Sequence, residues 1–275
     1  MISAKIVKDS VTEQGARLTT FQLRYHRFIH SEMMTHRVFS RNASSSRAIP
    51  IQKQIKAVLK DMAIPIHWGA NRSGMQADKE IGKTKRFVAE TTWKLAGLCA
   101  CLFAYLLYKI GCHKQLANRV LEPFSYISVV VSATEWANFF ALRYHHMAQP
   151  EIQQLAKFMY EAYAQSQPKL LKQGEWHLPY VEEHEMKDIS QAIKSSVARC
   201  ARVSYNNHDG TKPSIENDLK LYNRLLGHQP IHASPAEHQA TPSKSGSRRS
   251  GNFIGWKQYR KGLKGENITS FTKEV

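Results

Sequence analysis

The stretch FQLRYHRFIHSEMMTHRVFSRNASSSRA, residues 21–48, joins a β-type segment to a loop rich in arginine and serine. Apolar and polar residues alternate in LTTFQLRYHRFI, residues 18–29, and in AKIVKDSV, residues 4–11. This alternation predicts two strands, paired antiparallel around a turn at residues 13–15. SEMMTHRVF, residues 31–39, predicts a short helix or a bend. The basic loop therefore begins where a predicted sheet ends.

Residues 35–48 carry Arg37, Arg41 and Arg47 among short hydroxyl and amide side chains. Guanidinium groups bind phosphate oxygens through paired hydrogen bonds, and serine hydroxyls with exposed backbone N–H groups can complete the shell. One interpretation is a phosphate pocket. A solvated basic loop, or a nonspecific nucleic-acid surface, explains the same composition.

The remaining sequence predicts an α+β fold, an antiparallel sheet with a large helical part. The β-branched run at residues 124–133 predicts a further strand. Helical patterns cover the rest, at residues 79–110, 113–121, 134–165, 186–205 and 216–229. We expect one catalytic domain over residues 1–240 and a basic, partly mobile tail over 241–275.

The longest apolar run, LAGLCACLFAYLLY at residues 95–108, is 14 residues long. Because a membrane span needs about 20 apolar residues, we expect a buried helix and no membrane segment. The four cysteines form no CxxC pair, which favours free thiols in a reducing cytosol. The first ten residues lack the apolar core of a signal peptide, so we expect a cytoplasmic protein.

An excess of positive charge points to an anionic partner. The chain has 39 Lys and Arg against 22 Asp and Glu, a net charge of +17. Nucleic acid, a nucleotide, a phosphorylated cofactor or an acidic surface would each satisfy it.

Two further segments carry polar residues of interest. Arg143 follows the apolar run FFAL, so its guanidinium needs an acceptor: a ligand oxygen, or an ion pair with Glu135 or Glu151. HASPAEH at residues 232–238 lacks zinc-site spacing, so we expect no metal site. In this segment we expect Ser234 to cap a helix whose Glu237 lies three residues on.

Together these segments resemble flavin-dependent thymidylate synthase, the alternative synthase that carries FAD. The family signature is Arg-His-Arg, then seven residues to a Ser and two more to an Arg. His36-Arg37, Ser45 and Arg47 match it within residues 21–50. NRVLEP and NFFALRYHHMAQPEIQQLA, within residues 113–160, resemble later family segments.

The order of the segments differs from the family. ARCARVSY and HASPAEH, within residues 190–240, resemble the segment that normally precedes the signature. The chain is therefore similar to a circularly permuted or segment-swapped form. Such a form is physically allowed because contacts depend on position in space, and domain termini often lie close together.

The resemblance implies a reaction and a site. The reaction is reductive methylation of dUMP to dTMP with methylenetetrahydrofolate, FAD and NADPH, in a homotetramer with shared active sites. Arg143 would be catalytic, sitting at the pyrimidine and favouring its N3-ionised form. The implied substrate-binding residues are Glu32, Met33, Met34, Thr35, Ala43, Ser44, Ser45, Ser46, Arg47 and Arg119. The implied cofactor-binding residues are His36, Arg37, Asn138, His232, Ser234 and Glu237.

Several residues depart from the family pattern. Thr35 replaces the first Arg of the signature, Ala43 lies near the place of a Glu, and Ala48 replaces a Tyr. Glu32 replaces a Gln that contacts the nucleotide, and an ionised carboxylate only accepts hydrogen bonds. Because that suits an amino group, a flavin-dependent methylase or hydroxymethylase of dCMP is an alternative.

An alternative of another class is a nucleic-acid-binding protein on the same fold without catalysis. SGSRRSGNFIGWKQYRKGLKGE, residues 245–266, places Phe253, Trp256 and Tyr259 among basic residues. Exposed aromatic rings between cations are typical of surfaces that stack on nucleic-acid bases.

Overall fold

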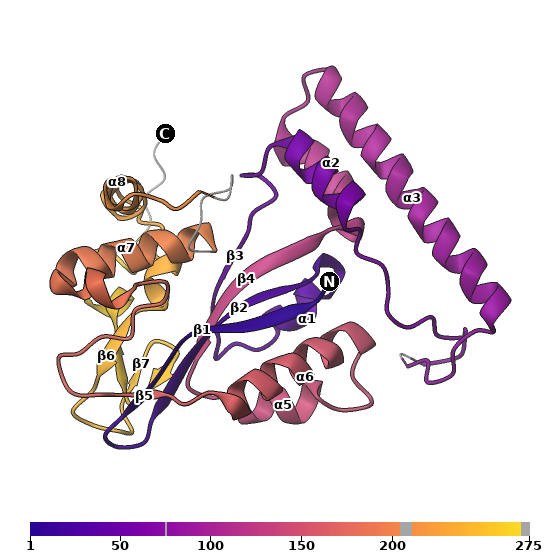
Figure 1. Cartoon of the computed structure of the whole chain (residues 1–275). Coiled ribbons are helices and arrows are strands. Elements are labelled where there is room, and N and C mark those ends of the chain that lie inside the picture. The colour runs from indigo at the N-terminus through magenta and orange to yellow at the C-terminus, as the bar shows by residue number, and fades with distance from the viewer. Residues whose placement is uncertain (75, 204–210, 271–275) are drawn as a thin grey trace.

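A five-stranded sheet forms the centre of the computed structural model, which describes residues 1–74, 76–203 and 211–270 (Figure 1). The strand order is β3-β4-β2-β1-β5. Neighbouring strands are antiparallel except at the edge, where β5 runs parallel to β1. The strands are β1 (Ser3–Thr12), β2 (Arg17–His26), β3 (Ser40–Ala43), β4 (Tyr126–Ala133) and β5 (Lys169–Leu171). The predicted α+β class and the first antiparallel strand pair are confirmed.

Helices surround this sheet and connect its strands. The α-helices are α1 (His30–Met34), α2 (Ile51–Lys60), α3 (Lys83–Lys109), α4 (Lys114–Ala117), α5 (Ala137–Arg143), α6 (Pro150–Gln165), α7 (Ile189–Arg202) and α8 (Ile215–Leu226). The 3-10 helices are η1 (Arg27–Ile29), η2 (Asn118–Phe124), η3 (Glu183–Lys187), η4 (Ser234–Glu237) and η5 (Tyr259–Gly262). The helix expected at 113–121 is instead a short α-helix followed by a 3-10 helix that contains Pro123.

The two faces of the sheet differ because successive side chains on a strand point to opposite sides. Phe21 and Leu23 of β2 lie in the main core with Val129 of β4, covered by α5 and α6. Gln22 and Arg24 of β2 point to the other face, where α7 packs over part of the sheet. The sequence alternation in β2 therefore separates a dry face from a partly polar one.

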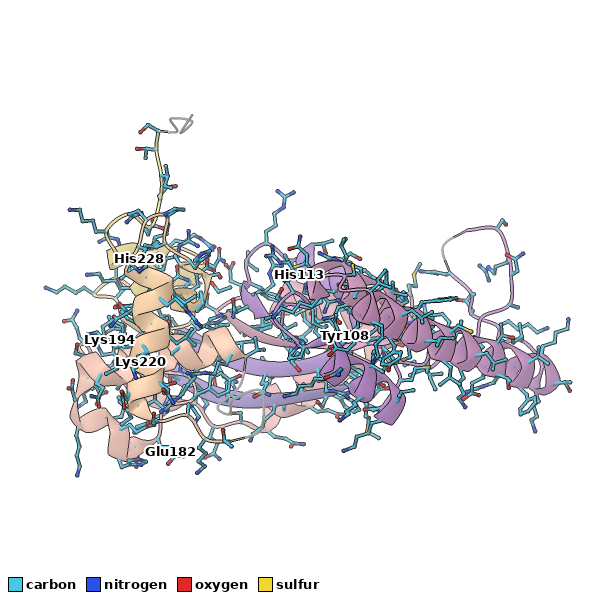
Figure 2. All side chains as sticks on the ribbon, turned by 90° about the horizontal axis from the view of Figure 1, so that it is seen from above. Tyr108, His113, Glu182, Lys194, Lys220 and His228 are labelled. Atoms are coloured by element: carbon cyan, nitrogen blue, oxygen red, sulfur yellow. The ribbon has the colours of Figure 1, made fainter. Side chains whose placement is uncertain are left out.

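Helix α3 is exposed, so the prediction of a buried helix is wrong for this chain. Only small residues of its apolar run, such as Gly97, Ala100 and Ala104, are buried, and they pack against α2 and η2. Leu98, Leu102 and other large side chains are about half exposed. Figure 2 shows α3 running beyond the rest of the molecule. Length and composition would let α3 cross a membrane, a criterion that core helices of soluble proteins also meet.

The segment of residues 240–262 is folded into the protein, within the range 241–275 that the sequence predicts as a basic, partly mobile tail. It forms β6 (Ala240–Pro242), β7 (Arg249–Ser250), β8 (Phe253–Ile254) and β9 (Trp256–Gln258). Phe253 and Trp256 are fully buried against Leu18 and Leu171 of the main sheet. Gly255, at φ +77°, serves a tight turn between β8 and β9. Glycines that indicated mobility in the sequence here permit close packing.

Trp256 offers a test of this packing. Trp256→Ala should lower the free energy of unfolding by about 3–5 kcal/mol, because a fully buried indole is replaced by a cavity. Urea unfolding followed by circular dichroism measures the change. Lys257 lies on the exposed side of the same strand, so the free energy of unfolding of Lys257→Ala should stay within about 0.5 kcal/mol of that of the parent chain. Equal stability of the two variants would show that the segment is detached.

Candidate functional site

Arg143, the last residue of α5, reaches across to the signature segment. Its Nε donates to His36 Nε2 at 3.0 Å, its Nη1 to Glu32 Oε2 at 3.0 Å, and its Nη2 to Thr35 Oγ1 at 3.2 Å. The structure thus brings four of the predicted site residues together from segments more than 100 positions apart.

The ion-pair partners considered from sequence are engaged elsewhere. Glu135 accepts a hydrogen bond from Arg249, and Glu151 accepts from the backbone N–H of Ile66. Arg143 does form an intramolecular ion pair, but with Glu32. A guanidinium has five N–H donors, and three are used here. Two donors remain for the oxygen or nitrogen of a ligand.

His36 is held neutral by its surroundings. The side chain is buried and packs against the rings of Phe39 and Phe139. This burial, followed by the charges of Arg143 and Arg41, lowers the pKa of His36 to about 4. Because Nε2 accepts from Arg143, the single proton of the neutral ring sits on Nδ1.

Arg41 fixes the path of the loop between α1 and β3. Its Nη1 donates to the carbonyl oxygens of Met33, Met34 and His36 at 3.0–3.1 Å. The side chain of Met33 is fully buried in the main core, so the predicted substrate contact cannot come from that side chain. Its carbonyl is already engaged by Arg41.

A cavity of about 340 Å³ lies beside this loop and joins the signature to the segment expected to be permuted. Its wall is made by His30, Met34, Arg37, Phe39, Arg41, Ala43, Glu237 and Asn252. Among the described residues, the guanidinium of Arg37 has no hydrogen bond or ion pair. An unpaired guanidinium at a cavity suits an anionic group. In the same described ranges, no cluster of three or more His, Cys, Asp or Glu could hold a metal ion.

Glu122 gathers a second group of predicted residues, and the sequence analysis did not single it out. Its carboxylate accepts from Ser46 Oγ at 3.0 Å and from Arg119 Nη1 at 3.1 Å, and Arg27 pairs with it at 3.1 Å. A carboxylate three residues after Arg119 was the only sequence signal for this contact. Arg47, on the same loop as Ser46, remains exposed.

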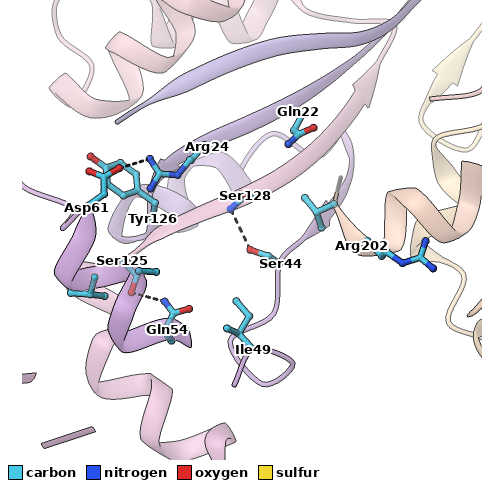
Figure 3. Close-up of a pocket in the computed structure, with 13 residues that line it drawn as sticks. Gln22, Arg24, Ser44, Ile49, Gln54, Asp61, Ser125, Tyr126, Ser128 and Arg202 are labelled. Carbon is cyan, nitrogen blue, oxygen red and sulfur yellow. Dashed lines mark hydrogen bonds and ion pairs between the residues drawn. The ribbon is translucent and has the colours of Figure 1, made fainter. Parts of the chain in front are cut away.

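Ser44 lies at a different cavity, of about 300 Å³, on the partly polar face of the sheet (Figure 3). Its Oγ accepts from the backbone N–H of Ser128 at 3.2 Å. Arg24 and Arg202 line this cavity, but each is paired with a carboxylate, Asp61 and Asp218 respectively. The cavity beside Arg37 is therefore the better candidate for an anion.

The remaining predicted residues are spread over the surface. The side chains of Ser45, Asn138 and His232 are exposed, and Asn138 lies in α5, the helix that ends at Arg143. Ser234 does not cap a helix as expected: it lies inside η4, and its hydroxyl donates to Asn42 Oδ1 at 3.3 Å. Glu237 forms an ion pair with Arg260. None of these five side chains is bonded to Arg143 among the described residues.

The fold is α+β, and Arg143 with its partners Glu32, Thr35 and His36 forms a preorganised site next to a cationic cavity. The sequence model of the family described as thymidylate synthase complementing protein matches residues 9–169. The chain belongs to this family, and the predicted resemblance is confirmed. The match includes the signature and Arg143 but ends before residue 190, so the permuted origin of residues 190–240 stays a prediction.

Solved structures are similar over part of the chain. A UMP/dUMP methylase, PolB from Streptomyces cacaoi, bound with 5-Br dUMP, is 19% identical with a TM-score of 0.49, over 60% of this chain and 90% of that one. The flavin dependent thymidylate synthase ThyX from Helicobacter pylori, complexed with FAD and dUMP, is 19% identical with a TM-score of 0.36, over 53% of this chain and 67% of that one. No curated protein matches the chain.

The pKa of His36 is directly testable. In NMR titrations the imidazole should stay neutral from pH 8 down to about pH 4. Arg143→Gln should raise this pKa, because one of the two nearby positive charges is removed while the burial remains. A His36 resonance that titrates near pH 6.5 in the parent chain would contradict the arrangement.

The same lowered pKa links stability to pH. The unfolded chain binds a proton at this histidine below about pH 6.5 and the folded chain does not, so stability falls as pH drops from 6.5 toward 4.

Proposed function

We propose that this chain catalyses the reductive methylation of dUMP to dTMP, with methylenetetrahydrofolate as carbon donor, FAD as cofactor and NADPH as reductant. The observation that carries the proposal is the Arg143–His36 contact of 3.0 Å within a chain of this family. It joins the arginine expected at the pyrimidine to the histidine expected at the flavin.

The residues beside the first cavity fit the anionic part of FAD. Arg37 offers a guanidinium that is unpaired among the described residues, and Asn252 offers an amide in the same wall. The carboxylate of Glu237, also in this wall, is paired with Arg260. The volume of about 340 Å³ is at the lower end for ligand pockets, about 300–1,000 Å³, so one chain would hold only part of a dinucleotide. When bound, the flavin would supply the one-carbon transfer and hydride chemistry of the reaction.

Arg143 would act on the pyrimidine through its two remaining N–H donors. Contacts with Glu32, Thr35 and His36 fix the guanidinium before substrate arrives, so little reorganisation is needed. Donors aimed at a carbonyl oxygen or at N3 stabilise negative charge on the ring. That charge makes C5 the more nucleophilic carbon.

Glu32 supports a second candidate substrate, dCMP. Its Oε2 accepts from Arg143, whereas Oε1 has no hydrogen bond among the described residues. A free carboxylate oxygen beside the arginine could accept from an exocyclic amino group, which cytosine has and uracil lacks. Methylation or hydroxymethylation of dCMP would follow from the same site.

We propose a cytoplasmic homotetramer with shared active sites. The exposed apolar face of α3 provides a surface that association would bury. Asn138 and His232 are both exposed on the single chain, and a partner subunit could contact the same ligand beside them.

The nucleic-acid-binding alternative loses the aromatic part of its support, while the net charge of +17 remains. Phe253 and Trp256 are fully buried, so these rings are not exposed for stacking on bases. Tyr259 is half-buried, and its hydroxyl is within 2.7 Å of that of Tyr222.

Turnover tests the reaction and its substrate. FAD-loaded protein receives methylenetetrahydrofolate and NADPH, with dUMP and dCMP in parallel, and products are identified by mass. One added methyl group on dUMP alone is the expected result. Addition to dCMP alone selects the second candidate.

In the same assay, Arg143→Ala should lower kcat by about 100-fold or more while FAD stays bound. Arg72→Ala, which removes an arginine from the exposed ion pair with Asp78, is the matched control and should keep parent activity. Normal turnover by Arg143→Ala would refute its catalytic role.

Association through α3 is tested by sedimentation. The parent chain should sediment as a tetramer, and Leu102→Glu should shift it to smaller species because a charge enters an apolar interface. Leu170→Glu, similarly exposed but on edge strand β5, should leave the tetramer intact. A monomeric parent chain would contradict the proposed assembly.

A further inference from the structure

The C-terminal segment, residues 249–262, forms part of the wall of the cationic cavity although it lies outside the family match. Asn252 of this segment faces the cavity beside Arg37. A smaller cavity of about 190 Å³ adjoins it, since Glu237 and Asn252 line both. Gly251, Gln258, Arg260 and Lys261 complete the smaller cavity. The two hollows therefore form one elongated site.

Hydrogen bonds fix this segment against the signature strand. Ser40 Oγ, in β3, accepts from Asn252 Nδ2 at 3.3 Å and from Gln258 Nε2 at 3.1 Å. Gln258 Nε2 also donates to the carbonyl of Glu237 at 2.9 Å. Because Ser40 and Gln258 are both buried, the wall is built into the fold.

Gly251 allows the close approach in this wall. Its φ is +58°, and a Cβ at this position would lie 2.1 Å from Gln258 Oε1. Any larger residue would displace the Gln258 side chain that bonds Ser40. The segment thus has a local geometry suited to its place at the cavity.

Cations line both ends of the elongated site. Arg37 and Arg41 lie at the larger cavity, and Arg260 and Lys261 at the smaller one. Two carboxylates oppose them: Glu237 pairs with Arg260, and Glu266 pairs with Arg260 at 3.0 Å and with Lys261 at 2.8 Å. Glu237 and Glu266 balance Arg260 and Lys261, so the net positive charge of the two cavities comes from Arg37 and Arg41 in the larger one.

We propose that the cavity-lining residues of the C-terminal segment complete the cofactor site, and that two of them, Arg260 and Lys261, bind phosphate oxygens of a dinucleotide. This deepens the proposed function and rests on its assignment of FAD. Among the described residues, Glu266 uses one of the three donors of the Lys261 ammonium, and three of the five N–H groups of Arg260 are used. The other donors of both side chains are available to a ligand. Two adjoining cavities that both carry cations suit an elongated ligand whose diphosphate lies in the smaller cavity, against Arg260 and Lys261.

Ligand binding tests the inference without turnover. Full-length protein is titrated with FAD, FMN and ADP, using flavin fluorescence for the first two and calorimetry for ADP. Lys261→Gln should weaken FAD and ADP by about tenfold, since one charged hydrogen bond to phosphate is lost. The affinity for FMN, which has a single phosphate, should change less than about twofold. Lys257→Gln, on the exposed side of β9, is the matched control and should bind all three as the parent does.

Each outcome decides the inference. Unchanged FAD and ADP affinity in Lys261→Gln, with native circular dichroism, overturns it. If Lys261→Gln lowers the affinity for FMN and for FAD equally, the assignment of a diphosphate to this site is wrong. Lys261-dependent FAD binding in a protein that methylates neither dUMP nor dCMP refutes the proposed function and supports the inference. Normal methylation by the parent, together with FAD affinity that Lys261→Gln leaves unchanged, supports the proposed function and refutes the inference. The parent protein could bind ADP but no flavin. In that case, weaker ADP binding by Lys261→Gln supports a diphosphate site at Lys261 and refutes FAD as its ligand.

Discussion

The antiparallel pairing of β3 with β4 is the constraint on which the site depends. Ser40 lies opposite Ser132, so the residues before β3 meet those after β4. That register places His36 beside the α5 helix and lets Arg143 reach it. Ser40 also accepts two hydrogen bonds from the C-terminal segment. The four residues of β3 thus hold three distant parts of the chain together. A shift of the β3–β4 register by one residue would turn every side chain of β3 to the other face of the sheet.

A buried polar chain ties the later segments to the same sheet. Ser10, His177, Thr20, Ser132 and His238 are linked in that order by contacts of 2.6–2.9 Å, and all five are fully buried. Burial lowers the pKa of His238 to about 3, and burial followed by Lys8 lowers the pKa of His177. Both imidazoles are therefore neutral at physiological pH and act as hydrogen-bonding groups. This network holds the end of η4, with Glu237, in a fixed position relative to β4.

Helix α3 shows a packing constraint of a different kind. Its small residues face the body and its large apolar residues face outward, the reverse of a helix that completes a monomer core. At Gly97, an added Cβ would lie 2.5 Å from Met62 Cε, so a larger residue here would displace the Met62 side chain. The apolar run that predicted burial is thus only half covered within one chain, because sequence composition records how apolar a helix is and not which surface covers it.

The sequence by itself determined the α+β class, the antiparallel strands and the signature residues, because alternation and motif spacing are local properties of the chain. It also named His36 and Arg143 as parts of one site. Only the tertiary structure decided that Arg143 pairs with Glu32, that Glu122 collects Ser46 and Arg119, and that Phe253 and Trp256 are buried. These contacts join positions that are distant in the chain or depend on which face a side chain presents. Strand register and packing fix them, and neither is encoded in any single stretch of residues.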